Sequence, residues 1–164
     1  MTKSYFKSIH LLDKINNNIL DNPFFAYKIF NIEEIENLNL PYKGKNNKQL
    51  FINIVEKSNV VIDLSFLTKI LNAVQHDIEE DCLLLDTQIS VQLRDVLSQN
   101  TIRRAIFFGQ RPSNIGLHIE GSLYKTIEIS GCKLFFAHPL SMIEANGEYK
   151  KLLWSEMKNL FEIA

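Results

Sequence analysis

The run at residues 132–139, Cys-Lys-Leu-Phe-Phe-Ala-His-Pro, constrains the fold most strongly. Its centre, residues 134–136, is continuously apolar, as is typical of a strand that is covered on both faces. Pro139 has no backbone N–H to donate, so the strand must end there. His138 therefore stands at the exit of a buried strand, and ligand sites in open α/β sheets lie outside the carboxyl ends of strands. We take His138 as the first candidate site residue.

Other segments of the chain also predict strands. Three apolar runs have the character of buried strands, and they occupy residues 50–55, 82–85 and 105–108. An aromatic run at residues 24–30 predicts a further strand. Residues 123–129 read as an extended segment that Ser130-Gly131 joins to the final strand, which predicts a hairpin.

Helical patterns lie between and after these strands. Asp63 or Ser65 can cap a helix whose buried stripe consists of Phe66, Leu67, Ile70, Leu71 and Val74. Residues 90–99 predict a second helix, and residues 141–145 a short turn. Residues 148–163 predict a long amphipathic helix with Trp154 near the seam and with inward-facing Leu152, Leu153, Met157, Leu160 and Phe161. Buried strands that alternate with helices predict an α/β fold, a three-layer α/β/α sandwich with a mostly parallel central sheet.

The composition limits the functional classes. The 164 residues carry 18 basic and 19 acidic side chains, a net charge of −1, so no global positive field attracts nucleic acid. No apolar run approaches a membrane span, and the first residues lack the apolar centre of a signal peptide, which predicts a cytoplasmic protein without membrane contact. Cys82 and Cys132 each adjoin an apolar run and are expected to be buried free thiols, and no ligand spacing or cofactor motif predicts a metal or a cofactor.

Residues 1–22 differ from the rest of the chain. Tyr5, Phe6, Ile9 and Leu12 recur at mostly helical spacing with lysines between them, and Pro23 follows as a breaker. The segment reads either as a first helix packed on the core or as a peptide that docks on another protein. We divide the chain into a partner-binding segment, residues 1–22, and a core domain, residues 23–164.

The order of the core motifs resembles the uracil-DNA glycosylase superfamily. The resemblance is carried by the helix at residues 66–74 with the strand at 82–87, by Ala-Ile-Phe-Phe-Gly at 105–109, and by Leu-Phe-Phe-Ala-His-Pro-Leu-Ser at 134–141. It implies a uracil-DNA glycosylase-like fold. It would also give His138 the role of stabilising negative charge on a leaving base, with Asp86 or Glu56 positioning water.

The departures from that superfamily point to a degenerate site. The loop at residues 56–59, Glu-Lys-Ser-Asn, lacks the glycine that lets a backbone approach a flipped base. Asp86 stands where the superfamily has an asparagine, and a carboxylate only accepts hydrogen bonds. Leu140 replaces the serine of the His-Pro-Ser motif. We therefore expect no catalytic residues, and an active DNA glycosylase using His138 and Asp86 is the alternative. No Walker loop, dinucleotide fingerprint or nucleophile elbow supports another α/β enzyme.

A second resemblance fits these departures. Residues 140–146 followed by Lys-Lys-Leu-Leu-Trp at 150–154, together with the N-terminal segment, are similar to the psi-subunit family of bacterial DNA polymerase III. The resemblance implies an accessory protein of DNA replication that binds clamp-loader subunits and a chi-like protein, which links the clamp loader to single-strand-binding protein. Contact with DNA would then be indirect, and the partner-binding anchors would be Tyr5, Phe6, Ile9 and Leu12.

The loop at residues 41–49 leaves two readings open. It carries Lys43, Lys45 and Lys48 around one glycine. Such a loop either contacts phosphate or is simply solvated, and we favour solvation because isolated lysines carry little recognition content.

Overall fold

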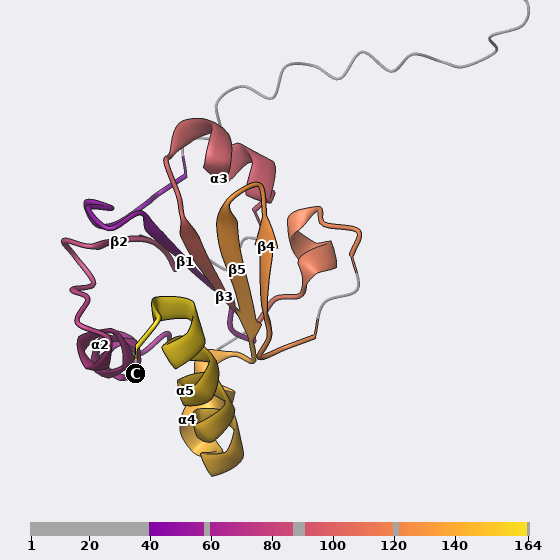
Figure 1. Ribbon diagram of the computed structural model, residues 1–164. Helices are drawn as coiled ribbons and strands as arrows, with labels where there is room; N and C mark the ends of the chain where they lie inside the picture. The colour runs from indigo at the N-terminus through magenta and orange to yellow at the C-terminus, as the bar shows by residue number, and fades with distance from the viewer. Residues whose placement is uncertain (1–39, 58–59, 87–90, 120–121, 164) are drawn as a thin grey trace, which may run out of the picture. The chain divides into compact units, whose positions relative to one another are not determined.

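A five-stranded sheet forms the centre of the computed structural model, which describes residues 40–57, 60–86, 91–119 and 122–163 (Figure 1). The strand order is β2-β1-β3-β5-β4. The sheet consists of β1 (Leu50–Ile54), β2 (Cys82–Leu85), β3 (Arg104–Phe108), β4 (Thr126–Ile129) and β5 (Cys132–Ala137). The first three and β5 pair in parallel, whereas β4 pairs with β5 in the antiparallel sense. The predicted strand at 24–30 and the segment 1–22 lie outside the described residues.

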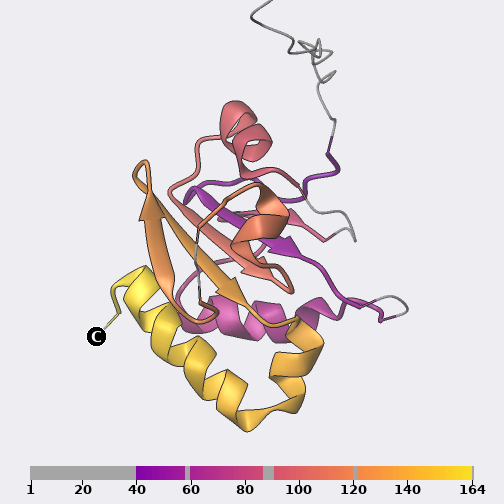
Figure 2. The same cartoon turned by 90° about the vertical axis from the view of Figure 1, so that its right-hand side faces the viewer.

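Helices cover both faces of this sheet (Figure 2). One face carries α2 (Leu64–Ala73), α4 (Leu140–Ala145) and α5 (Gly147–Phe161), and the other carries α3 (Leu93–Gln99) and the short 3₁₀ helix η1 (Pro112–Ile115).

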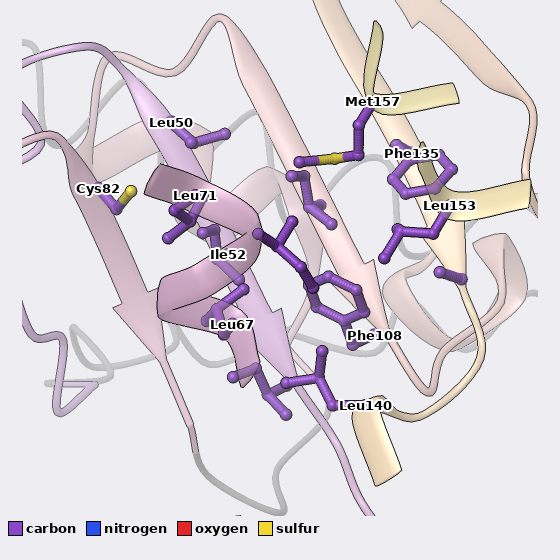
Figure 3. Packing of buried hydrophobic residues seen from close by; sticks show 14 of the residues in the cluster. Leu50, Ile52, Leu67, Leu71, Cys82, Phe108, Phe135, Leu140, Leu153 and Met157 are labelled. Atoms are coloured by element: carbon purple, nitrogen blue, oxygen red, sulfur yellow. The ribbon is translucent and has the colours of Figure 1, made fainter. Parts of the chain in front are cut away.

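Alternate residues of each strand serve the two faces. In β1, Leu50 and Ile52 pack with Leu67 and Met157 of the first helix layer (Figure 3), while Phe51 packs with the second layer. Because side chains alternate across a strand, a sheet covered on both faces needs continuously apolar strands. The predicted α/β class with a mostly parallel sheet is therefore confirmed.

Most local predictions agree with the structure. The strands predicted within residues 50–137 form, including the 126–137 hairpin, and Asp63 caps α2 by accepting a hydrogen bond from Ser65 N at 2.8 Å. The helix predicted at 90–99 begins only at Leu93. Residues 141–145, expected as a turn, belong to α4.

The predicted inward position of Leu152 is wrong, since this side chain is 48% exposed. The buried stripe of α5 consists of Leu153, Met157 and Leu160, which are spaced as neighbours on one helix face. Leu152 lies about 100° around the helix from Leu153 and falls off that stripe. Phe66 of α2, also expected in a buried stripe, is only partly buried against the core.

The 41–49 loop lies along the free edge of β2. Lys43 exchanges backbone hydrogen bonds with Leu84 at 2.8 and 2.9 Å, which satisfies part of an edge that would otherwise be open to pairing. The three lysines of the loop form ion pairs: Lys43 with Asp86, Lys45 with Glu80 and Lys48 with Asp81.

Gly109 ends β3 in a conformation that requires glycine. Its φ is +76°, and a Cβ built there would lie 1.9 Å from the carbonyl oxygen of Val55. Gly131, in the hairpin turn, has the same φ of +76° but nothing within 4 Å of its Cβ position. Alanine substitutions at the two glycines therefore distinguish the cost of a left-handed backbone, present at both positions, from the cost of steric overlap, present only at Gly109.

We expect Gly131→Ala to lower the free energy of unfolding by about 1 kcal/mol, the cost of a left-handed non-glycine residue. Gly109→Ala should cost clearly more, because the new methyl group also forces the ends of β1 and β3 apart. Urea unfolding followed by circular dichroism measures both losses. Equal losses in the two variants would contradict the close approach at Gly109.

Candidate functional site

The carboxyl ends of β1, β3 and β5 meet at one edge of the sheet. Strand β2, which follows β1 in the chain, pairs with one side of β1. Strand β3 pairs with the other side of β1, so the strand order reverses there. Ligand sites of open α/β sheets lie at such a switch point. The three strand ends bring Glu56, Gln110 and His138 to this edge.

His138 follows β5 and is held by two tyrosines. Its Nδ1 shares a hydrogen bond of 2.9 Å with the hydroxyl of Tyr124. Its ring stacks on Tyr149 of α5, with 4.2 Å between ring centroids and 11° between ring planes. Burial raises the pKa of the Tyr124 hydroxyl, so this group stays protonated at neutral pH and can donate to the imidazole. One nitrogen and one ring face of His138 are thus engaged in packing.

Glu56 follows β1 and caps a helix. Only 6% of the residue is exposed. Its carboxylate accepts hydrogen bonds from Ser141 N at 3.0 Å and from Ser141 Oγ at 2.7 Å. Because Pro139, at the N-cap of α4, provides no side-chain cap, Glu56 satisfies the first turn of α4 from 85 residues away. The carboxylate of Glu56 therefore stabilises the start of α4.

Asp86 follows β2 and lies far from His138. Two strands, β1 and β3, separate β2 from β5, which amounts to three spacings of about 4.8 Å, or roughly 14 Å between the strand axes. Asp86 Oδ2 instead pairs with Lys43 Nζ at 2.6 Å. The structure therefore does not bring together His138 and Asp86, the two residues that an active DNA glycosylase would use.

A small cavity of about 150 Å³ adjoins His138. It is lined by Gln110 and Arg111 after β3, by Leu123, and by Pro139. Gln110 is 4% exposed, and neither its amide nitrogen nor its amide oxygen has a hydrogen-bond partner among the described residues. An amide can both donate and accept, so this cavity can hold water or a small polar group, but none of the described residues that line it offers a carboxylate base.

Sequence reasoning missed three residues of this region. The position of Gln110 directly after a glycine-terminated strand could have indicated it. Tyr124 and Tyr149 carry no local signal, because they reach His138 only through the hairpin and through the packing of α5. The predicted anchors Tyr5, Phe6, Ile9 and Leu12 lie outside the described residues.

Other reactive groups are buried or scattered. Cys82 and Cys132 are free and buried, as predicted, and burial raises the pKa of their thiols to about 12 and about 11. Both therefore remain protonated, and unreactive as nucleophiles, at neutral pH.

Across the described ranges, no group of three His, Cys, Asp or Glu side chains is placed to hold a metal ion. Nor does this part of the chain contain a helix long and apolar enough to cross a membrane.

Comparison with family models, curated proteins and solved structures found no match to the chain. The functional reading therefore depends on the strand-end geometry and on the motifs of the sequence itself.

Removing the Glu56 carboxylate should destabilise the fold. We expect Glu56→Ala to lower the free energy of unfolding by about 2 kcal/mol, because two hydrogen bonds to a buried charged group are lost. Ser141→Ala should cost about 1 kcal/mol, since the backbone N–H of residue 141 still donates. Urea unfolding of both single variants and the double variant gives the coupling energy. Additive losses would show that the two residues do not interact.

Proposed function

We propose that this chain is a non-catalytic accessory subunit of the bacterial DNA polymerase III holoenzyme, similar to the psi family, with a degenerate uracil-DNA glycosylase-like core. In this role it bridges the clamp loader to a chi-like protein that contacts single-strand-binding protein. The commitment of Glu56 to the cap of α4 is the observation that carries the non-catalytic part of the proposal.

The strand-end site favours binding over hydrolysis. A general base must lie within hydrogen-bond reach of the water that it activates. The carboxylate of Glu56 is occupied by Ser141, and Asp86 is paired with Lys43 on the far side of two strands. His138 is stacked on Tyr149 and hydrogen-bonded to Tyr124. Each group that the glycosylase alternative needs thus has a structural partner instead.

The order of the strand ends supports the glycosylase-like ancestry in this proposal. Glu56, Asp86, Gly109 and His138 follow β1, β2, β3 and β5 in that sequence. This is the order that the resemblance expects for the water-activating loop, the base-reading residue, the glycine and the histidine. The replication partners come from the psi resemblance and from the amphipathic pattern of residues 1–22.

The proposal predicts that the aromatic anchors of the N-terminal segment bind the clamp loader. Full-length tagged protein should retain clamp-loader subunits from lysate, identified by mass spectrometry. The double variant Tyr5→Ala, Phe6→Ala should lose them while its circular dichroism stays unchanged. A matched double variant, Lys3→Ala, Lys7→Ala, keeps the apolar anchors and should retain the subunits. If the aromatic double variant still retains them, the assignment of the segment is wrong.

The proposal also predicts that a uracil-containing DNA strand remains intact with the purified chain, because the described residues place no unpaired carboxylate beside His138 to activate water. Alkaline cleavage of a labelled oligonucleotide detects uracil excision, and an authentic glycosylase serves as the positive control. Excision by the wild-type chain that disappears in His138→Ala would support the enzymatic alternative instead.

A further inference from the structure

The groove between α2 and α5 is a surface that the strand-end site does not use. Both helices lie on the same face of the sheet (Figure 2) and bury one stripe each. Above these stripes a cavity of about 260 Å³ opens between them, lined by Phe66, Ile70 and Ala73 of α2 and by Leu153 and Trp154 of α5. Trp154 is 40% exposed. Ala73 has the smallest side chain in the lining, which leaves room at the end of α2.

Both charged side chains among the described residues that line this groove are positive. Lys69 of α2 and Lys150 of α5 complete its lining, and Lys150 Nζ lies 5.7 Å from the ring centroid of Phe66. Neither lysine forms an ion pair among the described residues. On α5, Lys150, Lys151 and Lys158 are the i−4, i−3 and i+4 neighbours of Trp154, so lysines flank the tryptophan along the helix.

The acidic residues at the start of α2 and on α5 hydrogen-bond to other groups or lie on another side of the helix. Helix α2 contains no Asp or Glu. On α5, Glu156 accepts hydrogen bonds from Thr126 N and from Asn159. Glu148 lies in the first turn, about 160° around the helix from Lys150. At the start of α2, Asp63 accepts hydrogen bonds from Ser65, which lower the pKa of its carboxyl group, and Lys69 makes only the smallest contribution to this shift. The groove therefore presents an apolar floor within a basic rim.

We propose that this groove docks an acidic, amphipathic segment of a partner protein, with apolar side chains seated between Phe66 and Trp154 and carboxylates facing Lys69 and Lys150. The cavity lies below the 300–1,000 Å³ typical of small-molecule sites, so it fits anchor side chains rather than a cofactor. A second copy of this chain would set lysines against lysines, because a two-fold interface pairs a patch with itself. The proposal depends only on described residues, so it stands or fails separately from the role of residues 1–22.

The sequence contains a built-in reporter for this proposal, since Trp154 is its only tryptophan. The probe is a tryptophan-free helical peptide of about 14 residues, with leucines at i, i+3, i+4 and i+7 and glutamates at the polar positions. A matched peptide carries lysine in place of every glutamate. Titration of the full chain with the acidic peptide should shift the Trp154 emission to shorter wavelength and saturate. Raising the salt concentration should weaken the binding, because salt screens exposed charges.

Matched variants test the rim and the floor of the groove separately. The double variant Lys69→Glu, Lys150→Glu should weaken binding by about ten-fold, as expected when two exposed ion pairs become repulsions. Arg94→Glu reverses a charge on α3, across the sheet, and should leave the affinity within about two-fold. Ala73→Leu should fill the groove and also weaken binding, whereas Asn72→Leu adds the same side chain to an exposed position outside the lining and should not. Circular dichroism shows whether each variant is folded.

Several outcomes would overturn the proposal. These are no saturable shift with the acidic peptide, an equal shift with the lysine peptide, or unchanged affinity in folded Ala73→Leu. An emission shift with phosphatidylserine vesicles but not with the peptide would assign the groove to anionic membranes instead. Dimers in sedimentation experiments that Ala73→Leu abolishes would assign it to a second copy.

Discussion

The parallel hydrogen-bond ladder that joins β1, β3 and β5 supports every other part of this structure. Ile106 and Phe107, at its centre, are both fully buried but pack in clusters on opposite faces of the sheet. A parallel sheet with such strands is stable only when helices cover both faces, because either bare face would expose large apolar side chains. The same ladder aligns the three strand ends and so decides which polar residues become neighbours.

Two side-chain contacts tie these strand ends to the helix layer. Glu56 holds the first turn of α4, and Tyr149 of α5 covers one face of His138. Removing a partner from a buried charged group costs more than the bond itself contributes, since the remaining group is left desolvated. Residues that could serve chemistry at this edge therefore stabilise the packing of α4 and α5. Gln110 differs from them, because its buried amide has no partner in the described part of the chain.

Helix α5 presents different surfaces to its surroundings. Leu153, Met157 and Leu160 pack against the sheet, whereas Trp154 and Lys150 border the groove against α2. An exposed tryptophan between lysines contributes little to the core. Its large apolar ring and the neighbouring charges are better suited to contact with another molecule, where aromatic residues often dominate the binding energy.

The class of the fold and the location of the candidate site could be predicted because their signals are local. The continuous apolar run before His138, the cap at Asp63 and the turn at Gly131 each depend on a few adjacent residues. The exposure of Leu152 could not be predicted in the same way. An apolar side chain on a helix shows that burial would be favourable, but it does not show how the helix is rotated against the sheet.

By itself, the sequence determined most strands and helices of the described residues to within a few residues at each end, with α4 and η1 as exceptions, and that His138 follows a buried strand. Those properties follow from side-chain periodicity and from the backbone limits of proline and glycine. Only the tertiary structure decided that Glu56 meets Ser141 across 85 residues, that β1 and β3 separate Asp86 from the end of β5, and that α2 and α5 leave a basic groove between them. The physical reason is that apolar burial is non-directional: it drives surfaces together, and the detailed packing of the whole core then selects which neighbours meet.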